Sequence, residues 1–153
     1  DYVWRDTWER TLRVNVVAPC SLMRRAVQHY IERGGGTIIS ISSWAAQRGP
    51  GTPALMTYSA SKAALLAATK AIARNYAKDN ILAYSIAPGV VRTRMSEEFA
   101  AVTVGEDVVT ASLAMNEWVP PSDLAALATF LSTGACRHLT GATLDVNGAS
   151  YIR

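Results

Sequence analysis

The sequence predicts an α/β fold in which helices cover a doubly wound parallel sheet. Segments with helical spacing alternate with short, β-branched apolar segments that are typical of buried strands. Half of the 153 residues are hydrophobic, which is enough to bury a core. No internal repeat indicates a solenoid. Alternating helices and strands of this kind are the pattern of a parallel sheet with helical crossovers.

The first element is predicted to be a helix over residues 7–31. Asp6 precedes Glu9 by three positions, the spacing of a capping box, and apolar residues then recur every three or four positions. Pro19 is expected to bend or interrupt this helix, because proline has no N–H to donate. The three glycines at 34–36 are expected to end it.

The next elements are a strand, a loop and a long helix. Residues 37–41 are short and β-branched, which indicates a buried strand. Residues 42–53 are rich in Ser, Gly and Pro and are expected to form a loop. Residues 54–78 are dominated by Ala and Leu with interspersed Lys, a composition that strongly favours helix.

The last third of the chain continues the alternation. A second buried strand is predicted at 81–87, and Pro88-Gly89 ends it. Residues 94–119 mix apolar and polar residues and are expected to form short helices in a mobile lid. A helix at 122–132 and a final strand at 143–146 complete the prediction.

Composition and charge exclude several classes of function. The net charge is +3 and the basic residues are scattered, so the sequence does not indicate a nucleic-acid-binding module. No apolar stretch is long enough to suggest a membrane span. Cys20 and Cys136 fit no metal or redox spacing, and we expect reduced thiols in a cytoplasmic protein. His29 and His138 are isolated, so no metal site is predicted.

Candidate catalytic residues lie where a parallel sheet places its ligands, beyond the carboxyl ends of the strands. Tyr58 and Lys62 are four residues apart at the start of a predicted helix, so their side chains share one face. A nearby ammonium favours the ionised phenolate, which would let Tyr58 exchange a proton with a substrate oxygen. Ser43 directly follows the first strand; its hydroxyl either polarises a carbonyl or merely caps a turn. Asn15 lies in an apolar helical stretch, where it is either a structural core residue or part of a site.

Taken together, Asn15, the Ser43 that ends TIISISS, the Tyr58-Ser-Ala-Ser-Lys62 stretch, and Pro88-Gly89 with Thr93 resemble the catalytic half of the short-chain dehydrogenases and reductases. The order and the spacing of these residues agree with that family, from about residue 1 to residue 150. The resemblance implies an NAD- or NADP-dependent oxidoreductase that interconverts a carbonyl and a secondary alcohol. The hydride chemistry would belong to the cofactor.

The resemblance also implies a role for each matching residue. Tyr58 would be the general acid or base, and Lys62 would favour its ionised form and hold the nicotinamide ribose. Ser43 would polarise the carbonyl, and Asn15 would hold a water in a proton relay from Lys62. Cofactor contacts are implied for Tyr58 and Lys62 and for the turn formed by Pro88, Gly89, Val91 and Thr93. Residues 94–119 would cover a small-molecule substrate, and the two long helices would form a homo-oligomer.

The resemblance covers only part of that family's domain. The family begins with a strand and a glycine-rich turn that holds the cofactor pyrophosphate, and neither is found here. Residues 49–54 fit G-x-G-x-x-A as letters, but two prolines remove donors that phosphates need. We therefore expect residues 1–153 to be one partial Rossmann-like domain, the C-terminal half, with an unpaired edge at strand 37–41. The alternative is a non-catalytic fragment that only self-assembles.

Overall fold

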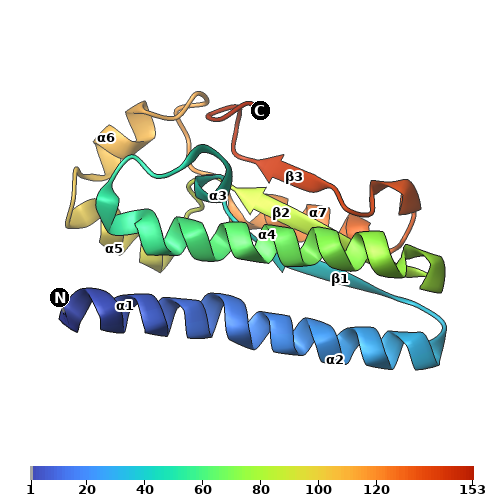
Figure 1. Ribbon diagram of the computed structural model, residues 1–153. Coiled ribbons are helices and arrows are strands. Elements are labelled where there is room, and N and C mark those ends of the chain that lie inside the picture. Colours follow the sequence, from blue (N-terminus) through green and yellow to red (C-terminus); the bar gives the residue numbers. More distant parts are fainter. Residues whose placement is uncertain (1) are drawn as a thin grey trace.

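A parallel three-stranded sheet forms the centre of the molecule. The computed structural model describes residues 2–153, and its strands lie in the order β1-β2-β3 (Figure 1). They comprise β1 (Gly36–Ile41), β2 (Ile81–Pro88) and β3 (Thr143–Val146). The parallel register pairs Gly36 with Ile81 and Pro88 with Val146. The predicted α/β class is thus confirmed.

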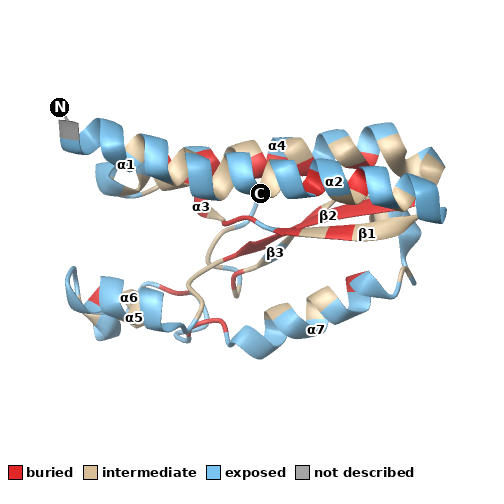
Figure 2. Ribbon diagram, turned by 90° about the horizontal axis from the view of Figure 1, so that it is seen from below, coloured by how far each residue is buried: buried red, intermediate tan, exposed pale blue. Residues whose placement is uncertain are grey.

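Helices cover both faces of this sheet. The sheet lies between a layer formed by α1, α2 and α4 and a second layer formed by α7 (Figure 2). The helices are α1 (Tyr2–Leu12), α2 (Ala18–Arg33), α3 (Ala45–Arg48), α4 (Met56–Tyr76), α5 (Arg94–Ala101), α6 (Glu106–Ala111) and α7 (Pro121–Ser132). A five-residue π-helix, η1 (Arg13–Val17), joins α1 to α2, and short 3₁₀ turns occupy Pro53–Leu55, Ala77–Asp79 and Arg137–Leu139.

Strand β2 is the centre of the core because it is paired on both sides. All eight of its residues are buried. Successive side chains of a strand point to opposite faces, so β2 serves both layers. Ile81 and Ala83 pack with α2 and α4, whereas Leu82, Tyr84 and Ile86 pack with α7. The continuous apolar sequence of β2 therefore reflects two covered faces.

A cluster of buried hydroxyls connects the sheet to α4. Ser40 and Ser85 are direct partners in the register of β1 and β2, and their Oγ atoms are 2.9 Å apart. The Ser40 Oγ also lies 2.8 Å from the Thr69 Oγ1 of α4. Buried polar groups need such partners, and a shift in register would separate them. The cluster thus favours one alignment of β1 on β2.

The first helix begins earlier than predicted, and its hydrogen-bonding pattern changes before its proline. Helix α1 starts at Tyr2 rather than residue 7, so Asp6 lies inside it and forms no capping box. Trp4 and Trp8, one turn apart, pack in a tilted arrangement with ring centroids 5.3 Å apart and extend the helical pattern toward the N-terminus. The helical pattern changes at η1, ahead of Pro19, and α2 follows without a break.

One connection ends α2 as predicted, and two other segments, the loop after β1 and the ends of α4, differ from the prediction. Gly34 ends α2 in a left-handed conformation (φ 80°) that favours glycine, and its N–H bonds the carbonyl of Ile31. The predicted loop after β1 contains the short helix α3. Helix α4 spans Met56–Tyr76, slightly shorter than the predicted 54–78, because its two ends tighten into 3₁₀ turns.

Strand β1 forms an open edge of the described sheet, since it pairs with β2 on one side alone. A groove of about 380 Å³ runs along this edge. Its walls are largely apolar and come from α2, β1 and α4: Pro19, Leu22, Met23, Ala26, residues 37–41 and Leu65.

Over the described residues, no helix has the length and apolar character needed to cross a membrane.

Candidate active site at the carboxyl ends of the strands

The loops that follow the three strands are joined by main-chain hydrogen bonds. The N–H of Ser42 bonds the carbonyl of Ile86 at 2.7 Å, and that of Trp44 bonds the carbonyl of Pro88 at 3.0 Å. The N–H of Gly89 bonds the carbonyl of Val146 at 2.9 Å. These hydrogen bonds fix the three loops relative to one another at the carboxyl end of the sheet. Parallel sheets bind their ligands at this end.

Tyr58 and Lys62 lie together in the first two turns of α4. Their i, i+4 spacing places the Lys62 Nζ 5.7 Å from the centroid of the Tyr58 ring. The same ammonium donates a hydrogen bond to the carbonyl of Ile41, the last residue of β1, at 3.0 Å. An ammonium carries three donors, so this bond holds the lysine in place and leaves two donors for a ligand.

Lys62 is also electrostatically unusual. Burial lowers the pKa of its ammonium from the ordinary value of 10.5, because desolvation disfavours the charged form. The unfolded chain therefore binds more protons than the folded chain between the lowered pKa and 10.5. Across that window the contribution of Lys62 to stability rises with pH.

This effect predicts how Lys62→Met changes stability. The free energy of unfolding of the wild type, minus that of the variant, should increase as the pH is raised from neutral toward 10.5. Denaturant unfolding of both proteins at several pH values measures this difference, in which the shared titrating groups cancel. A difference that stays constant or falls with rising pH would contradict the assignment.

Ser43 is buried in the turn after β1. Its Oγ accepts a hydrogen bond from the N–H of Ala45 at 3.2 Å, which is the turn-capping role that serine commonly takes. A hydroxyl that accepts in this way still has its own proton to donate. The neighbouring Ser42 donates from its Oγ to the carbonyl of Lys62 at 3.0 Å and so joins this turn to α4.

The side chain of Asn15 connects η1 to α4. Its Nδ2 donates to the Oγ of Ser61 at 3.1 Å, and Ser61 in turn donates to the carbonyl of Tyr58 at 2.6 Å. Asn15 is therefore connected to the turn of α4 that carries Tyr58 and Lys62.

The segment after β2 is held against β3 and the lid. A Cβ at Gly89 would lie 2.9 Å from the Cβ of Asn147, so the close approach of these two loops requires glycine. Val91 forms a parallel β-bridge with Val119, which closes the base of the 94–119 segment. The Thr93 side chain caps α5 by accepting from the N–H of Ser96 at 3.4 Å.

Residues 94–119 contain the two short helices α5 and α6, and contacts from Arg92 and Trp118 join α6 to the base of this segment. Arg92 lies over the ring of Trp118, with its guanidinium carbon 4.6 Å from the ring centroid, and pairs with Glu106 at 2.7 Å. The Trp118 Nε1 donates to Thr110 at 2.7 Å. Trp118 thus packs inside the 94–119 segment, in a buried cluster with Ala100 and Leu113.

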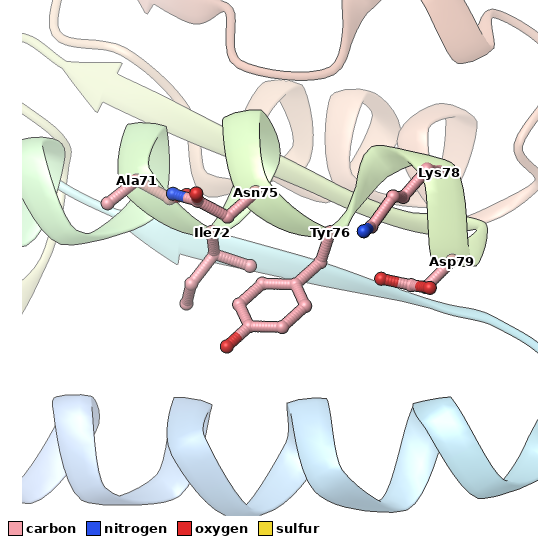
Figure 3. A pocket seen from close by; sticks show the side chains of 6 residues that line it. All are labelled: Ala71, Ile72, Asn75, Tyr76, Lys78 and Asp79. Atoms are coloured by element: carbon pink, nitrogen blue, oxygen red, sulfur yellow. The ribbon is translucent and has the colours of Figure 1, made fainter.

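A separate shallow hollow lies at the other end of α4, away from these groups (Figure 3). Ile72 and Tyr76 point toward α2, and both pack against the core cluster of that layer. Lys78 and Asp79 come from the 3₁₀ turn that precedes the amino end of β2. Parallel sheets bind ligands at the carboxyl ends of their strands, whereas this hollow lies near the amino end of β2. We therefore do not place the active site here.

The structure brings Asn15, Tyr58 and Lys62 into one connected cluster, whereas Ser43 and Tyr58, both described, are not hydrogen-bonded to each other. Pro88, Gly89, Val91 and Thr93 lie on the loop after β2, at the same end of the sheet. Sequence reasoning missed Ser61 and the Ile41 carbonyl. Ser61 could have been found from the sequence, because it lies between Tyr58 and Lys62. The Ile41 carbonyl could not, because no residue type marks a main-chain acceptor.

Comparison with known proteins places the whole chain in one family. A family profile described as Enoyl-(Acyl carrier protein) reductase matches residues 2–149. The human protein named Dehydrogenase/reductase SDR family member 4 is 32% identical over 151 residues. That match covers 99% of this chain and 54% of the human protein, so the chain spans about half the length of the curated relatives it matches.

Solved structures give the same result. The chain is 30% identical to a 4-hydroxyisoleucine dehydrogenase complexed with NADH, with a TM-score of 0.84 over 94% of this chain and 58% of that one. It is 28% identical to a gluconate 5-dehydrogenase from Burkholderia cenocepacia J2315 in complex with NADP and tartrate, with a TM-score of 0.85 over 96% and 58%. Relatives of this chain therefore bind NAD or NADP. The chain belongs to the short-chain dehydrogenase/reductase family and corresponds to its C-terminal portion.

Proposed function

We propose that this chain provides the catalytic half of an NAD(P)-dependent oxidoreductase that interconverts a carbonyl and a secondary alcohol. The observation that carries the proposal is the Tyr58–Lys62 pair, whose ammonium bonds the carboxyl end of β1. A phenol beside an ammonium, at the ligand-binding end of a parallel sheet, suits proton transfer to a substrate oxygen.

The residues at the carboxyl ends of β1 and β2 fit one end of the cofactor. Lys62 has two donors left for vicinal hydroxyls, and Gly89 lets the main chain after β2 run close to Asn147, which follows β3 at the same end of the sheet. Within residues 2–153 no turn with more than one glycine both follows a strand and opens a helix, so the described chain lacks the usual pyrophosphate site. We place the nicotinamide and its ribose beside Lys62, Pro88, Gly89, Val91 and Thr93.

The side chains would divide the proton chemistry between them. When bound, the cofactor supplies or accepts the hydride at the carbon of the substrate. Tyr58 gives its phenolic proton to the substrate oxygen during reduction and takes one back during oxidation. Lys62 stabilises the phenolate by its positive charge. Ser43 donates a hydrogen bond from its hydroxyl to the same substrate oxygen and polarises the carbonyl, and Asn15 holds a water in the proton relay from Lys62.

A second candidate is a non-catalytic fragment that only self-assembles. The observations that favour it are the missing pyrophosphate turn and the open, apolar edge at β1. Under the leading proposal, that edge is paired in the complete protein by a strand outside this chain.

Binding of the reduced cofactor separates the two candidates. We expect the full-length protein to bind NADH or NADPH and to melt at a higher temperature with the cofactor, because ligands that bind only the folded state stabilise it. The 153-residue chain is the comparison sample. If neither the full-length protein nor the 153-residue chain bound the cofactor at millimolar concentration or showed a thermal shift, the leading proposal would fail and the non-catalytic candidate would stand.

We also propose a homo-oligomer and a cytoplasmic location. The exposed face of α4 carries small residues, Ala60, Ala67 and Ala71, which would let a second helix approach closely. Cys20 and Cys136 are both unpaired thiols, which suits a reducing compartment.

A further inference from the structure

The side chain of Arg92 contacts three parts of the segment that would cover the substrate. Its guanidinium donates to the carboxylate of Glu106 at 2.7 Å and lies 3.6 Å from that of Glu97. Its Cζ lies 4.6 Å from the centroid of the Trp118 ring. Glu97 belongs to α5, Glu106 begins α6, and Trp118 lies near the end of the segment. One side chain thus joins both short helices to the end of residues 94–119.

The main chain of Arg92 belongs to the base of this segment. Its N–H donates to the carbonyl of Val119 at 2.9 Å, and the N–H of Val119 donates to the carbonyl of Val90 at 2.8 Å. Val91 and Val119 form the parallel β-bridge at the same place. Arg92 is therefore fixed through its backbone, and its side chain connects that fixed point to α5 and α6.

The interior of the segment packs beside the candidate catalytic serine. Ala100, Leu113 and Trp118 form a buried cluster, and Trp44 packs against it. Trp44 directly follows Ser43 in the chain. Figure 1 shows α5 and α6 at the end of the sheet toward which β2 and β3 point. The arrangement held by Arg92 thus places α5 and α6 against the turn that carries Ser43.

The polar contacts of Arg92 suit a closure that can be reversed. The side chains of Arg92, Glu97 and Glu106 are 45%, 44% and 50% exposed. Ion pairs with this exposure are individually weak, because water and salt compete for both partners. A guanidinium over an aromatic ring adds a further attraction. Together these contacts favour the closed arrangement and still allow the segment to open.

We propose that Arg92 is a positioning residue that keeps residues 94–119 closed over the substrate through its contacts with Glu97, Glu106 and Trp118. The inference rests on the proposed function, because it requires a substrate beside Ser43 and Tyr58. Arg92 itself is assigned no contact with substrate or cofactor.

This role predicts a specific kinetic effect. A ligand that binds only the closed arrangement has an apparent affinity that is reduced in proportion to the fraction of molecules that are closed. Loss of the Arg92 contacts lowers that fraction and so raises KM for the substrate. The substrate-bound complex is already closed, so kcat stays nearly unchanged.

The first test is Arg92→Met in the full-length protein, which removes the charge and the ion pairs and keeps an unbranched side chain. KM for a ketone that the protein reduces should rise roughly 3- to 10-fold, while kcat and the affinity for NAD(P)H change by less than about twofold. Without substrate, the amides of α5 and α6 should exchange faster with deuterium than in the wild type. Steady-state kinetics and hydrogen exchange measure the two effects.

The matched control is Arg94→Met, which removes the same charge two residues along the chain. Arg94 pairs with Glu98 of the same helix at 3.3 Å, and the two side chains are 90% and 67% exposed. This variant should keep the wild-type KM and the wild-type exchange of α5 and α6. Unchanged KM in Arg92→Met, or the same rise in both variants, would overturn the role of Arg92.

The second test is a double-mutant cycle with Glu106→Gln. This substitution removes the shortest ion pair and leaves the Arg92 guanidinium over Trp118, so it should raise KM less than Arg92→Met does. The double variant should have the KM of Arg92→Met alone, because the two residues act through one contact. A KM in the double variant that equals the product of the two single effects would show that they act independently and would overturn the proposed connection to α6.

The failure of this inference is distinguishable from failure of the proposed function. Wild-type turnover that depends on Tyr58, together with a normal KM in Arg92→Met, overturns the inference alone. Wild-type protein without Tyr58-dependent turnover overturns the proposed function and, with it, the role of Arg92 in substrate binding.

Discussion

Tyr58→Phe should lower kcat of the full-length protein by roughly 10²- to 10⁴-fold while leaving the affinity for NAD(P)H largely unchanged. The substitution removes one hydroxyl and keeps the ring that packs beside the Lys62 ammonium. Proton transfer at the substrate oxygen is lost, whereas the donors of Lys62 remain. Steady-state kinetics and a separate cofactor titration measure the two effects independently.

Tyr76→Phe is the matched control for this experiment. Tyr76 lies at the far end of the same helix and packs with the core rather than with the site residues. It should retain wild-type turnover. If Tyr58→Phe turned over as fast as Tyr76→Phe, the acid/base assignment would be wrong.

Ile86→Ala should destabilise the protein by about 2–5 kcal/mol, the usual cost of truncating a large aliphatic side chain in a core. Ile86 is fully buried in the central strand and packs against Leu131 of α7. The change removes apolar contacts and leaves a cavity between the sheet and α7. Denaturant unfolding measures the loss as a lower midpoint with a similar slope.

The control is Ile152→Ala, the same substitution at a side chain that is 79% exposed. It should change the free energy of unfolding by less than about 0.5 kcal/mol, as surface substitutions usually do. Equal effects at the two positions would mean that the α7 face of β2 is not the core described here.

The strands could be predicted well because their signals are local. Residues 143–146 form β3 as predicted, and β2 differs from the prediction by one residue. Both segments are short and bounded by turn residues, and β2 is largely apolar. The helix starts were less predictable: Asp6 has the pattern of a cap, but aromatic packing between Trp4 and Trp8 carries the helix further.

The candidate site was predictable in part for the same reason. The proximity of Tyr58 and Lys62 follows from their spacing on one helix. The bond from Lys62 to Ile41 and that from Asn15 to Ser61 join residues far apart in the chain, so they depend on the packing of α4 against β1 and η1. Pro19 was visible as a helix-disrupting residue. The change in helical pattern is centred on Asn15, four residues earlier, which is the residue whose carbonyl loses its α-helical donor to a proline at position 19.

The most direct test of the central claim is transfer of label from a deuterated cofactor. Full-length protein with NADPH or NADH deuterated at the reactive carbon, and a panel of simple ketones, should yield a secondary alcohol carrying one deuterium on the former carbonyl carbon. Mass spectrometry of the product detects it, and Tyr58→Phe should reduce the yield by roughly 10²- to 10⁴-fold. Reduction without label in the product, or equal labelled product from Tyr58→Phe, would contradict the proposal that this sheet edge catalyses hydride transfer with Tyr58 as the proton donor.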